Sequence, residues 1–250
     1  MKASERFTPE ILFEDNHLLI VNKPAGMLTQ GDSSGQVSLL EHLKTHIKNR
    51  DRKPGNVYLG MVQRLDKPVS GSIVFAKTSK AAARISAQIR AHQMTKCYLA
   101  VTEAESDRRW DRDIGTDGWC VVSHNLSRLK DRTIVDDDSE AAQLASLRFK
   151  TLLANGKLGI HAVQLITGRK HQIRAQLSAL AMPILGDRKY GSSFQPLRGR
   201  ILLHSYLVQV VHPTRKIEVK VVCSPPEEFF SLFTEQERTN FRSALEEISF

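Results

Sequence analysis

Hydrophobic and polar positions along the chain follow two different periods, which predict an α+β fold. Short apolar runs separated by turn residues are typical of β-strands, and the first two cover residues 11–13 and 17–21. Apolar residues three or four positions apart predict amphipathic helices over residues 37–47, with Ser38 as a candidate N-cap, and over residues 79–92. We therefore expect a mixed, mainly antiparallel sheet with flanking helices.

Later stretches extend the same pattern. The Asn155-Gly156 pair is a strong signal for a β-hairpin between residues 144–153 and 158–166, although the first arm taken alone also fits a helix. Residues 170–181 predict a helix with basic side chains in its first turns, where a helix favours anions. The remaining expected elements are strands at residues 72–76, 96–102, 201–211 and 217–222, a helix opened by Pro225-Pro226 and a last helix containing Phe241.

The helix over residues 79–92 has a predicted inner side. Its apolar residues Ala82, Ile85 and Ile89 are expected to face the core, and its basic residues to face solvent.

Length and composition bound the organisation of the chain. The 250 residues can bury a substantial core, and nothing in the sequence argues for a second domain. We expect one domain over residues 1–250, with residues 1–10 and 225–250 peripheral. Residues 103–140 are polar and rich in Asp, Arg and Gly, and we expect variable surface hairpins and loops there.

The hydrophobic content is ordinary for a soluble globular protein, at 41% with 25% charged residues. No apolar run approaches the roughly 18 residues that a membrane span requires. The N-terminus has no apolar core of the signal-peptide kind. The sequence therefore predicts a cytoplasmic protein with no membrane partner.

Cysteines and charge narrow the chemistry. Three scattered cysteines without a C-x-x-C pair indicate neither a disulfide framework nor a zinc site, and the acidic run at residues 136–138 is typical of solvated surface. The formal net charge of +9 suits a polyanionic partner such as RNA, although many basic proteins bind no nucleic acid. We expect no metal, no cofactor and no obligatory protein partner.

The stretch over residues 61–77 carries the candidate chemistry. It reads MVQRLDKPVSGSIVFAK, in which Lys67-Pro68 turns the chain and an apolar strand follows. Asp66 therefore lies in a stiff turn beside a sheet. From the local sequence alone, a surface turn in which Asp66 pairs with Arg64 or Lys67 is favoured over a catalytic carboxylate.

The stretch resembles the motif His-Arg-Leu-Asp-x-x-Thr-Ser-Gly of RluA-type pseudouridine synthases. Other blocks are similar to that family in the family's order: Asn22-Lys23-Pro24-Ala25-Gly26, Lys96-Cys97-Tyr98-Leu99-Ala100, Thr167 to Arg174, Gly186 to Gly191, and Leu203-His204-Ser205. The resemblance implies the pseudouridine synthase catalytic fold and an RNA-modifying isomerase. No S4-type RNA-binding domain is recognised ahead of the first strand, so a stand-alone catalytic domain is expected.

The resemblance also implies roles for individual residues. Asp66 corresponds to the family's catalytic carboxylate, Tyr98 to the tyrosine that faces the target uracil, and Arg174 to the cation that keeps the carboxylate charged. Arg64 corresponds to a residue that enters the RNA and takes the place of the flipped base. Lys23 lies in a block that the family places beside its active site as structural support.

Further residues are candidates for substrate binding. Lys67, Arg169, Lys170, Arg188 and Lys189 are candidate phosphate contacts, and each of them also fits ordinary solvated surface. The resemblance adds His171 to the substrate side of the site. Ile173 and Leu203 are candidates for its apolar wall, with ordinary core packing as the alternative.

Three departures from the family pattern put local hydrogen bonding and target choice in doubt. Gln63 and Gln176 stand where His is common, and Val69 replaces Thr. Because Asp66, Tyr98 and Arg174 are present, we expect an RNA pseudouridine synthase that acts on tRNA, ribosomal RNA or both. The main alternative is an RNA-binding or RNA-folding module of the same fold without activity. A glycosidase-like enzyme is a weaker alternative, since only one well-placed carboxylate is found.

Overall fold

The structure is a computed structural model that describes residues 7–103, 115–195 and 199–248. Its chain divides into two compact units. The first unit comprises Met1–Met94 and Leu207–Cys223, and the second comprises Thr95–Tyr206 and Ser224–Phe250. The expectation of one domain over residues 1–250 stays a prediction.

The first unit is built on antiparallel strand pairs. Neighbouring strands follow the order β1-β2-β4-β10, and β3 and β11 pair with β4 and β10 respectively. The strands are β1 (Glu10–Glu14), β2 (Leu18–Lys23), β3 (Gly60–Met61), β4 (Ser70–Ala76), β10 (Leu203–Val211, in this unit from Leu207) and β11 (Glu218–Val222). Their apolar faces form a core that includes Leu18, Ile20, Val74, Val208 and Val219. Every strand expected from the sequence in this region is present.

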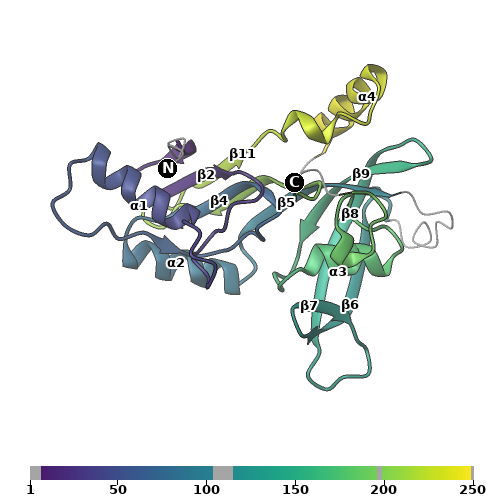
Figure 1. Ribbon diagram of the computed structural model, residues 1–250, viewed down its shortest axis with the longest axis horizontal. Coiled ribbons are helices and arrows are strands. Elements are labelled where there is room, and N and C mark those ends of the chain that lie inside the picture. Colours follow the sequence, from purple (N-terminus) through teal and green to yellow (C-terminus); the bar gives the residue numbers. More distant parts are fainter. Residues whose placement is uncertain (1–6, 104–114, 196–198, 249–250) are drawn as a thin grey trace. The chain divides into compact units, whose positions relative to one another are not determined.

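Two helices complete the first unit (Figure 1). Helix α1 (Leu39–Arg50) begins with Ser38 and Glu41 in a capping box, and it buries Leu39, Leu43 and Ile47 as its periodicity predicts.

Helix α2 (Ser79–Arg90) begins at its N-cap Thr78. Its buried residues are Ala81, Ile85 and Gln88, and the partly buried Ile89 packs against the core. The predicted inner side is therefore confirmed at Ile85 and Ile89, and it extends to Ala81 and Gln88, which the prediction left out. Gln88 is buried because its side chain pairs with both the N–H and the carbonyl of Val211, a contact that helical periodicity does not reveal.

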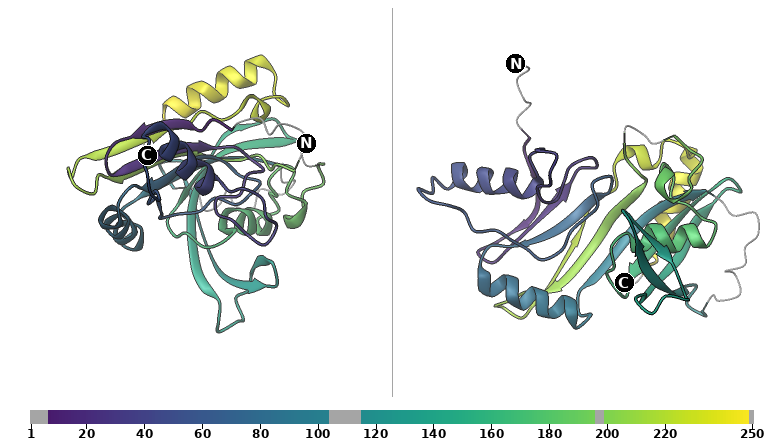
Figure 2. Two further views of the ribbon diagram at one scale, coloured as in Figure 1. Left: turned by 60° about the vertical axis from the view of Figure 1, so that its left-hand side comes forward. Right: turned by 60° about the horizontal axis from the view of Figure 1, so that its bottom comes forward.

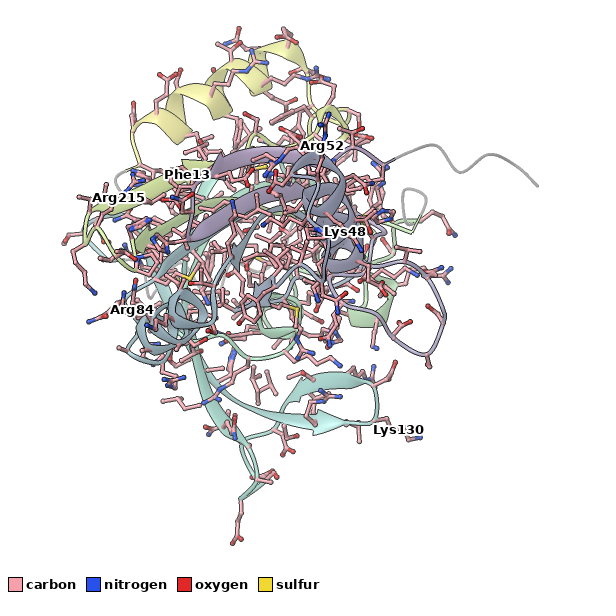
Figure 3. The ribbon with its side chains drawn as sticks, turned by 90° about the vertical axis from the view of Figure 1, so that its left-hand side faces the viewer. Phe13, Lys48, Arg52, Arg84, Lys130 and Arg215 are labelled. Atoms are coloured by element: carbon pink, nitrogen blue, oxygen red, sulfur yellow. The ribbon has the colours of Figure 1, made fainter. Side chains whose placement is uncertain are left out.

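The basic segment 48–56 is partly helical. Helix α1 runs on to Arg50, whose guanidinium donates to both carboxylate oxygens of Glu14 at 2.7 and 2.8 Å. Lys48 and Arg52 are exposed at the end of this helix (Figure 3). Lys48 and Arg52 are therefore exposed cations at the end of α1, whereas the charge of Arg50 is neutralised by Glu14.

The second unit contains a strongly paired antiparallel sheet in the order β5-β9-β8-β6-β7. Its strands are β5 (Thr95–Glu103), β6 (Cys120–Leu129), β7 (Arg132–Val135), β8 (Gln143–Ala154) and β9 (Leu158–Leu165). The hairpin predicted at Asn155-Gly156 is confirmed. Gly156 has a φ of 81°, and the Asn155 side chain accepts hydrogen bonds from the backbone of Lys157 and Leu158.

The polar segment 103–140 is more ordered within its described part than the sequence suggests. Strand β6 forms a hairpin with β7 and also pairs along β8, so it is an internal strand of the sheet. Its residues Cys120, Val122 and Leu126 are buried, and they alternate with more exposed neighbours. The β6–β7 hairpin agrees with the surface hairpins expected here. The pairing of β6 along β8 was not expected, because polar residues interrupt the period of two in this strand. Residues 104–114 lie outside the described part.

Helices of the second unit complete the described fold (Figures 1 and 2). Helix α3 (Gln172–Ala179) packs with Ala175 against Leu126 and Ala145 of the sheet. The predicted helix over residues 170–181 was too long, because His171 adopts a left-handed conformation with φ 54° at the N-cap. The chain then forms short 3-10 turns at Arg188–Tyr190 and Glu227–Phe229, and helix α4 (Glu235–Glu246) buries Phe241.

The helices and the mainly antiparallel strand pairs agree with the predicted α+β class. None of the helices in residues 7–103, 115–195 and 199–248 has the length and apolar content that a membrane span needs.

Candidate active site

The Asp66 turn is fixed on both sides by hydrogen bonds within the first unit. The Thr29 hydroxyl donates to the carbonyl of Leu65 at 2.7 Å and accepts from the N–H of the same residue at 3.3 Å. The N–H of Val69 donates to the carbonyl of Asp66 at 3.0 Å, which closes the turn at Lys67-Pro68. Leu65 and Val69 are buried. Asp66, which is partly buried, is therefore held between two packed residues.

Lys23 lies beneath this turn and is completely buried. Its ammonium donates to the carbonyl oxygens of Pro24, Met27 and Lys67 at 3.0, 2.8 and 3.2 Å. The Lys67 carbonyl also accepts from the N–H of Gly26 at 2.7 Å. Lys23 thus connects the Asn22-to-Gly26 block directly to the turn that carries Asp66.

The charge of Lys23 acts on Asp66. Burial lowers the pKa of Lys23 to about 7, and the Asp66 carboxylate partly offsets this by raising it. The carboxylate has this effect because opposite charges in a poorly solvated region attract strongly. The first unit therefore supplies a cation for Asp66 that the sequence assigned only to structural support.

Tyr98 lies on strand β5 of the second unit. It is 7% exposed and pairs in register with Val163 of β9. Because side chains alternate along a strand, Lys96 shares the face of Tyr98, whereas Cys97 lies on the opposite face.

Arg174 lies in helix α3 and is buried in an ion pair with Asp187. Its Nε donates to one carboxylate oxygen at 2.6 Å and its Nη2 donates to the other at 2.8 Å. The guanidinium also lies over the ring of Tyr190, with its Cζ 4.8 Å from the ring centroid. Arg174 is therefore an oriented internal cation and not a helix-surface arginine.

The segment that carries Asp187 is held by Glu103 at the end of β5. The Ser192 hydroxyl donates to the Glu103 carboxylate at 2.6 Å and accepts from the N–H of Gly186 at 3.0 Å. The N–H of Tyr190 donates to the carbonyl of Asp187 at 2.9 Å. These contacts fix the carboxylate that orients Arg174.

His171 is hydrogen-bonded through Nδ1 to the Tyr190 hydroxyl at 2.8 Å. The same hydroxyl accepts from the N–H of Thr133, and the Thr133 hydroxyl donates to the carbonyl of Lys170. The β6–β7 hairpin is thereby attached to the start of helix α3.

The candidate phosphate contacts are mostly exposed. Arg64, Lys67, Arg169, Lys170 and Arg188 all reach the surface, and Lys67 donates to the side-chain oxygen of Gln36 at 2.7 Å. Lys189 is partly buried, and its ammonium pairs with the carboxylate and the carbonyl of Asp131. Arg64 and Lys67 belong to the first unit, and the others belong to the second.

The two candidate wall residues are buried in the second unit, Ile173 at 5% and Leu203 at 3% exposure. Of the residues that depart from the family pattern, Val69 and Gln176 are buried. The Gln176 amide donates to the carbonyl of Ala145 at 3.0 Å, and its oxygen has no hydrogen-bond partner among the residues that the structure describes.

Sequence reasoning assigned no role to Asp187, Thr29 or Gln172. Asp187 lies in the family-like block Gly186 to Gly191, and this block was the one feature of the sequence that could have indicated its role. Thr29 bonds to the backbone of Leu65, and the Gln172 amide donates to the carbonyl of Ser146 at 3.0 Å. Both contacts join residues distant in the sequence, and single-sequence patterns carry no trace of them. The expected pairing of Arg174 with Asp66 joins the two units and stays a prediction.

Other reactive groups do not form an alternative site in the described ranges. No group of three His, Cys, Asp or Glu side chains within them could hold a metal ion. Burial raises the pKa of the Cys97 and Cys223 thiols to about 12, which disfavours the thiolate that a cysteine nucleophile needs.

Comparison with known sequences defines the class of this protein. The model of the RNA pseudouridylate synthase family matches residues 17–179, which include Asp66, Tyr98 and Arg174. The chain therefore belongs to the RNA pseudouridylate synthase family, which is a family of isomerases.

Individual relatives agree with this assignment. The chain is 35% identical over 206 residues to the uncharacterized RNA pseudouridine synthase YhcT of Bacillus subtilis, covering 82% of this chain and 64% of that protein. It is 32% identical over 237 residues to ribosomal large subunit pseudouridine synthase D of Xylella fastidiosa, covering 89% of this chain and 68% of the relative. The chain thus spans less than two thirds of the Bacillus subtilis protein.

A solved structure confirms the predicted fold. The human RNA pseudouridylate synthase domain containing 4 is similar with a TM-score of 0.69 at 24% identity, covering 95% of this chain and 93% of that one. The pseudouridine synthase fold expected from the sequence is therefore correct.

Proposed function

We propose that this protein isomerises uridine in RNA to pseudouridine and that Asp66 is the catalytic carboxylate. The observation that carries the proposal is the fixed turn of the family motif, in which Asp66 lies between buried neighbours and beside the buried ammonium of Lys23. No other described carboxylate combines this motif with a buried cation that is bonded only to carbonyl oxygens.

The reaction breaks the N1–C1′ bond, turns the uracil and forms a C5–C1′ bond. The C5 proton is lost and N1 gains a proton, so the atoms balance without a redox partner. Asp66 attacks C1′ in one route and removes the C2′ proton in the other, and both routes need its ionised form. The buried Lys23 interacts electrostatically with this carboxylate.

Tyr98 and Arg174 complete the proposed catalytic group. In the proposal, Tyr98 faces the uracil and Arg174 stabilises the Asp66 carboxylate. An arginine presents five N–H donors in a planar fork, and Asp187 engages Nε and Nη2. The proposed pairing of Arg174 with Asp66 depends on the positions of these residues in the family motifs.

The substrate needs a flipped uridine and backbone contacts that repay the cost of unstacking, which is a few kcal/mol. Arg64 is proposed to replace the flipped base, as its exposure allows, and Lys67, Arg169, Lys170, Arg188 and Lys189 are proposed to contact phosphates. His171, Ile173 and Leu203 are proposed to line the substrate side of the site.

Ribosomal RNA is the proposed target. The support is the 32% identity to a protein named ribosomal large subunit pseudouridine synthase D. Transfer RNA is the competing target, and the experiment below separates the two.

The activity is tested by tritium release from RNA labelled with 5-tritiated uridine, taken from cells that lack this protein. We expect release by the wild-type protein, with ribosomal RNA releasing more than transfer RNA. Mapping pseudouridine in the treated RNA then identifies the position. Absence of release from both fractions, with RNA binding retained, would instead support the inactive RNA-binding module.

A further inference from the structure

Lys96 is a basic residue of the second unit whose charge the known reaction leaves unexplained. It lies on strand β5, two residues before Tyr98 and on the same face. Its side chain is partly buried, and it forms no hydrogen bond or ion pair with any residue in the described ranges. A partly buried ammonium without a partner is unfavourable, so a countercharge from outside the chain would stabilise it.

Gly168 leaves room for this ammonium. A Cβ atom built on Gly168 would lie 3.3 Å from the Lys96 Nζ, which is tighter than an ordinary contact. Gly168 does not have the positive φ that commonly requires glycine, so the missing side chain matters here for space. The Lys96 ammonium therefore lies directly beside the backbone of residues 167–169.

The turn at residues 167–169 is fixed and accessible. The side-chain oxygen of Gln172 accepts from the Thr167 hydroxyl and from the N–H of Arg169, each at 2.9 Å. The amide nitrogen of Gln172 donates to the carbonyl of Ser146 at 3.0 Å. Gly168 and Arg169 remain exposed. An anion from solvent can therefore approach a rigid turn that has the Lys96 ammonium beside it and helix α3 directly after it.

We infer that Lys96 Nζ binds a phosphate group of the RNA substrate at the turn of residues 167–169, next to the target nucleotide. The identity of the RNA rests on the proposed function. Residues two apart on a strand are separated by about 7 Å, so Lys96 lies within the reach of one nucleotide from Tyr98. A nucleotide that places its uracil at Tyr98 can therefore place a neighbouring phosphate at Lys96. That phosphate supplies the countercharge, and binding releases counterions from the RNA.

The inference is tested by salt-dependent binding of an unmodified in-vitro transcript of large-subunit ribosomal RNA. Every protein carries Asp66→Asn, so that the RNA is not modified during the measurement. Affinity is measured between 50 and 300 mM KCl for Lys96→Met, Lys96→Arg and Gly168→Ala. Lys157→Met serves as the matched control, because Lys157 is an exposed lysine in the β8–β9 turn of the same unit.

We expect Lys96→Met to weaken binding about five- to tenfold at 0.1 M salt and to reduce the salt slope by about 0.7–0.9, as loss of one phosphate contact should. Lys96→Arg should keep the slope. Gly168→Ala should weaken binding without removing a charge, because the new Cβ displaces the ammonium. Lys157→Met should have the same affinity and the same salt slope as its Asp66→Asn parent. In proteins with Asp66 intact, Lys96→Met should raise KM for tritium release and leave kcat within about twofold.

Equal affinity and slope for Lys96→Met and its parent would overturn the inference. A lysine with only a structural role would lower the thermal stability of Lys96→Met without changing the slope, and Gly168→Ala would then bind normally. If the wild-type protein released no tritium, the proposed function would fail, whereas the binding comparison would still decide the role of Lys96.

Discussion

Lys23 in the first unit and Arg174 in the second are both buried cations, but they are held differently. Lys23 donates to three backbone carbonyls, which carry no net charge, so its positive charge remains available to Asp66. Arg174 is paired with the Asp187 carboxylate, and the pair is close to neutral. The first arrangement provides an electrostatic field, and the second provides a precise orientation.

Because Arg174 is paired with a buried carboxylate and Lys23 is not, we expect the largest loss of stability when the Arg174 pair in the second unit is broken. Asp187→Asn leaves the buried guanidinium of Arg174 without its carboxylate, and we expect a loss of about 3–5 kcal/mol in the free energy of unfolding. Urea denaturation measures this loss. As a control, Glu228→Gln removes the exposed ion pair with Arg200 and should cost less than about 1 kcal/mol. Similar losses for the two variants would mean that the Arg174 pair contributes no more than a surface contact.

The next effect concerns Lys23. Lys23→Met keeps a similar length but leaves the carbonyls without their donor, and we expect a loss of about 1–3 kcal/mol at pH 9. Below pH 7, where Lys23 is mostly charged in the folded protein, tritium release should also fall, because the positive charge beside Asp66 is lost. A variant with full stability and full activity would show that the ammonium neither holds the turn nor acts on Asp66.

The stability difference between the wild-type protein and Lys23→Met should depend on pH. Lys23 has a pKa of about 7 in the folded protein, against 10.5 as its ordinary value. Between these values the unfolded chain binds one more proton, so stability of the wild-type protein relative to Lys23→Met should rise with pH. The slope should approach about 1.4 kcal/mol per pH unit. Urea denaturation at pH 7, 8 and 9 measures it, and parallel pH profiles would contradict the assignment.

The smallest expected effect tests the hydrogen bonds of the Asp66 turn. Thr29→Val removes the hydroxyl that bonds to both backbone groups of Leu65, and we expect a loss of about 1–2 kcal/mol. Tritium release should fall as the turn loosens. Thr29→Ser restores the hydroxyl and should recover most of the stability and most of the tritium release. Failure of this rescue would indicate a packing role for the Thr29 methyl group.

Local signals in the sequence predicted those elements that depend on neighbouring residues. The Ser38 cap begins helix α1, and Asn155-Gly156 forms the hairpin, since each structure is determined within a few residues. The start of helix α3 was misplaced because it depends on the left-handed His171 and on Gln172, whose side chain bonds to the distant Ser146. Periodicity does not contain that information.

In the candidate site, too, the sequence predicted what a local motif carries and missed what distant contacts determine. The motif located Asp66, and the family resemblance brought Tyr98 and Arg174 into the account. The contact between Lys23 and the Lys67 carbonyl spans 44 positions, and the pairing of Arg174 with Asp187 depends on how a loop returns to a helix. Such partners are set by tertiary packing, so their identity could be obtained only from coordinates.

The central claim is that an ionised Asp66 carries out the reaction. Its most direct test is single-turnover tritium release by Asp66→Asn, a substitution that keeps the shape and removes the charge, with RNA affinity measured on the same protein. We expect a rate lower by about 10³-fold or more, with RNA affinity within about threefold of wild type. A rate near that of the wild-type protein would contradict it.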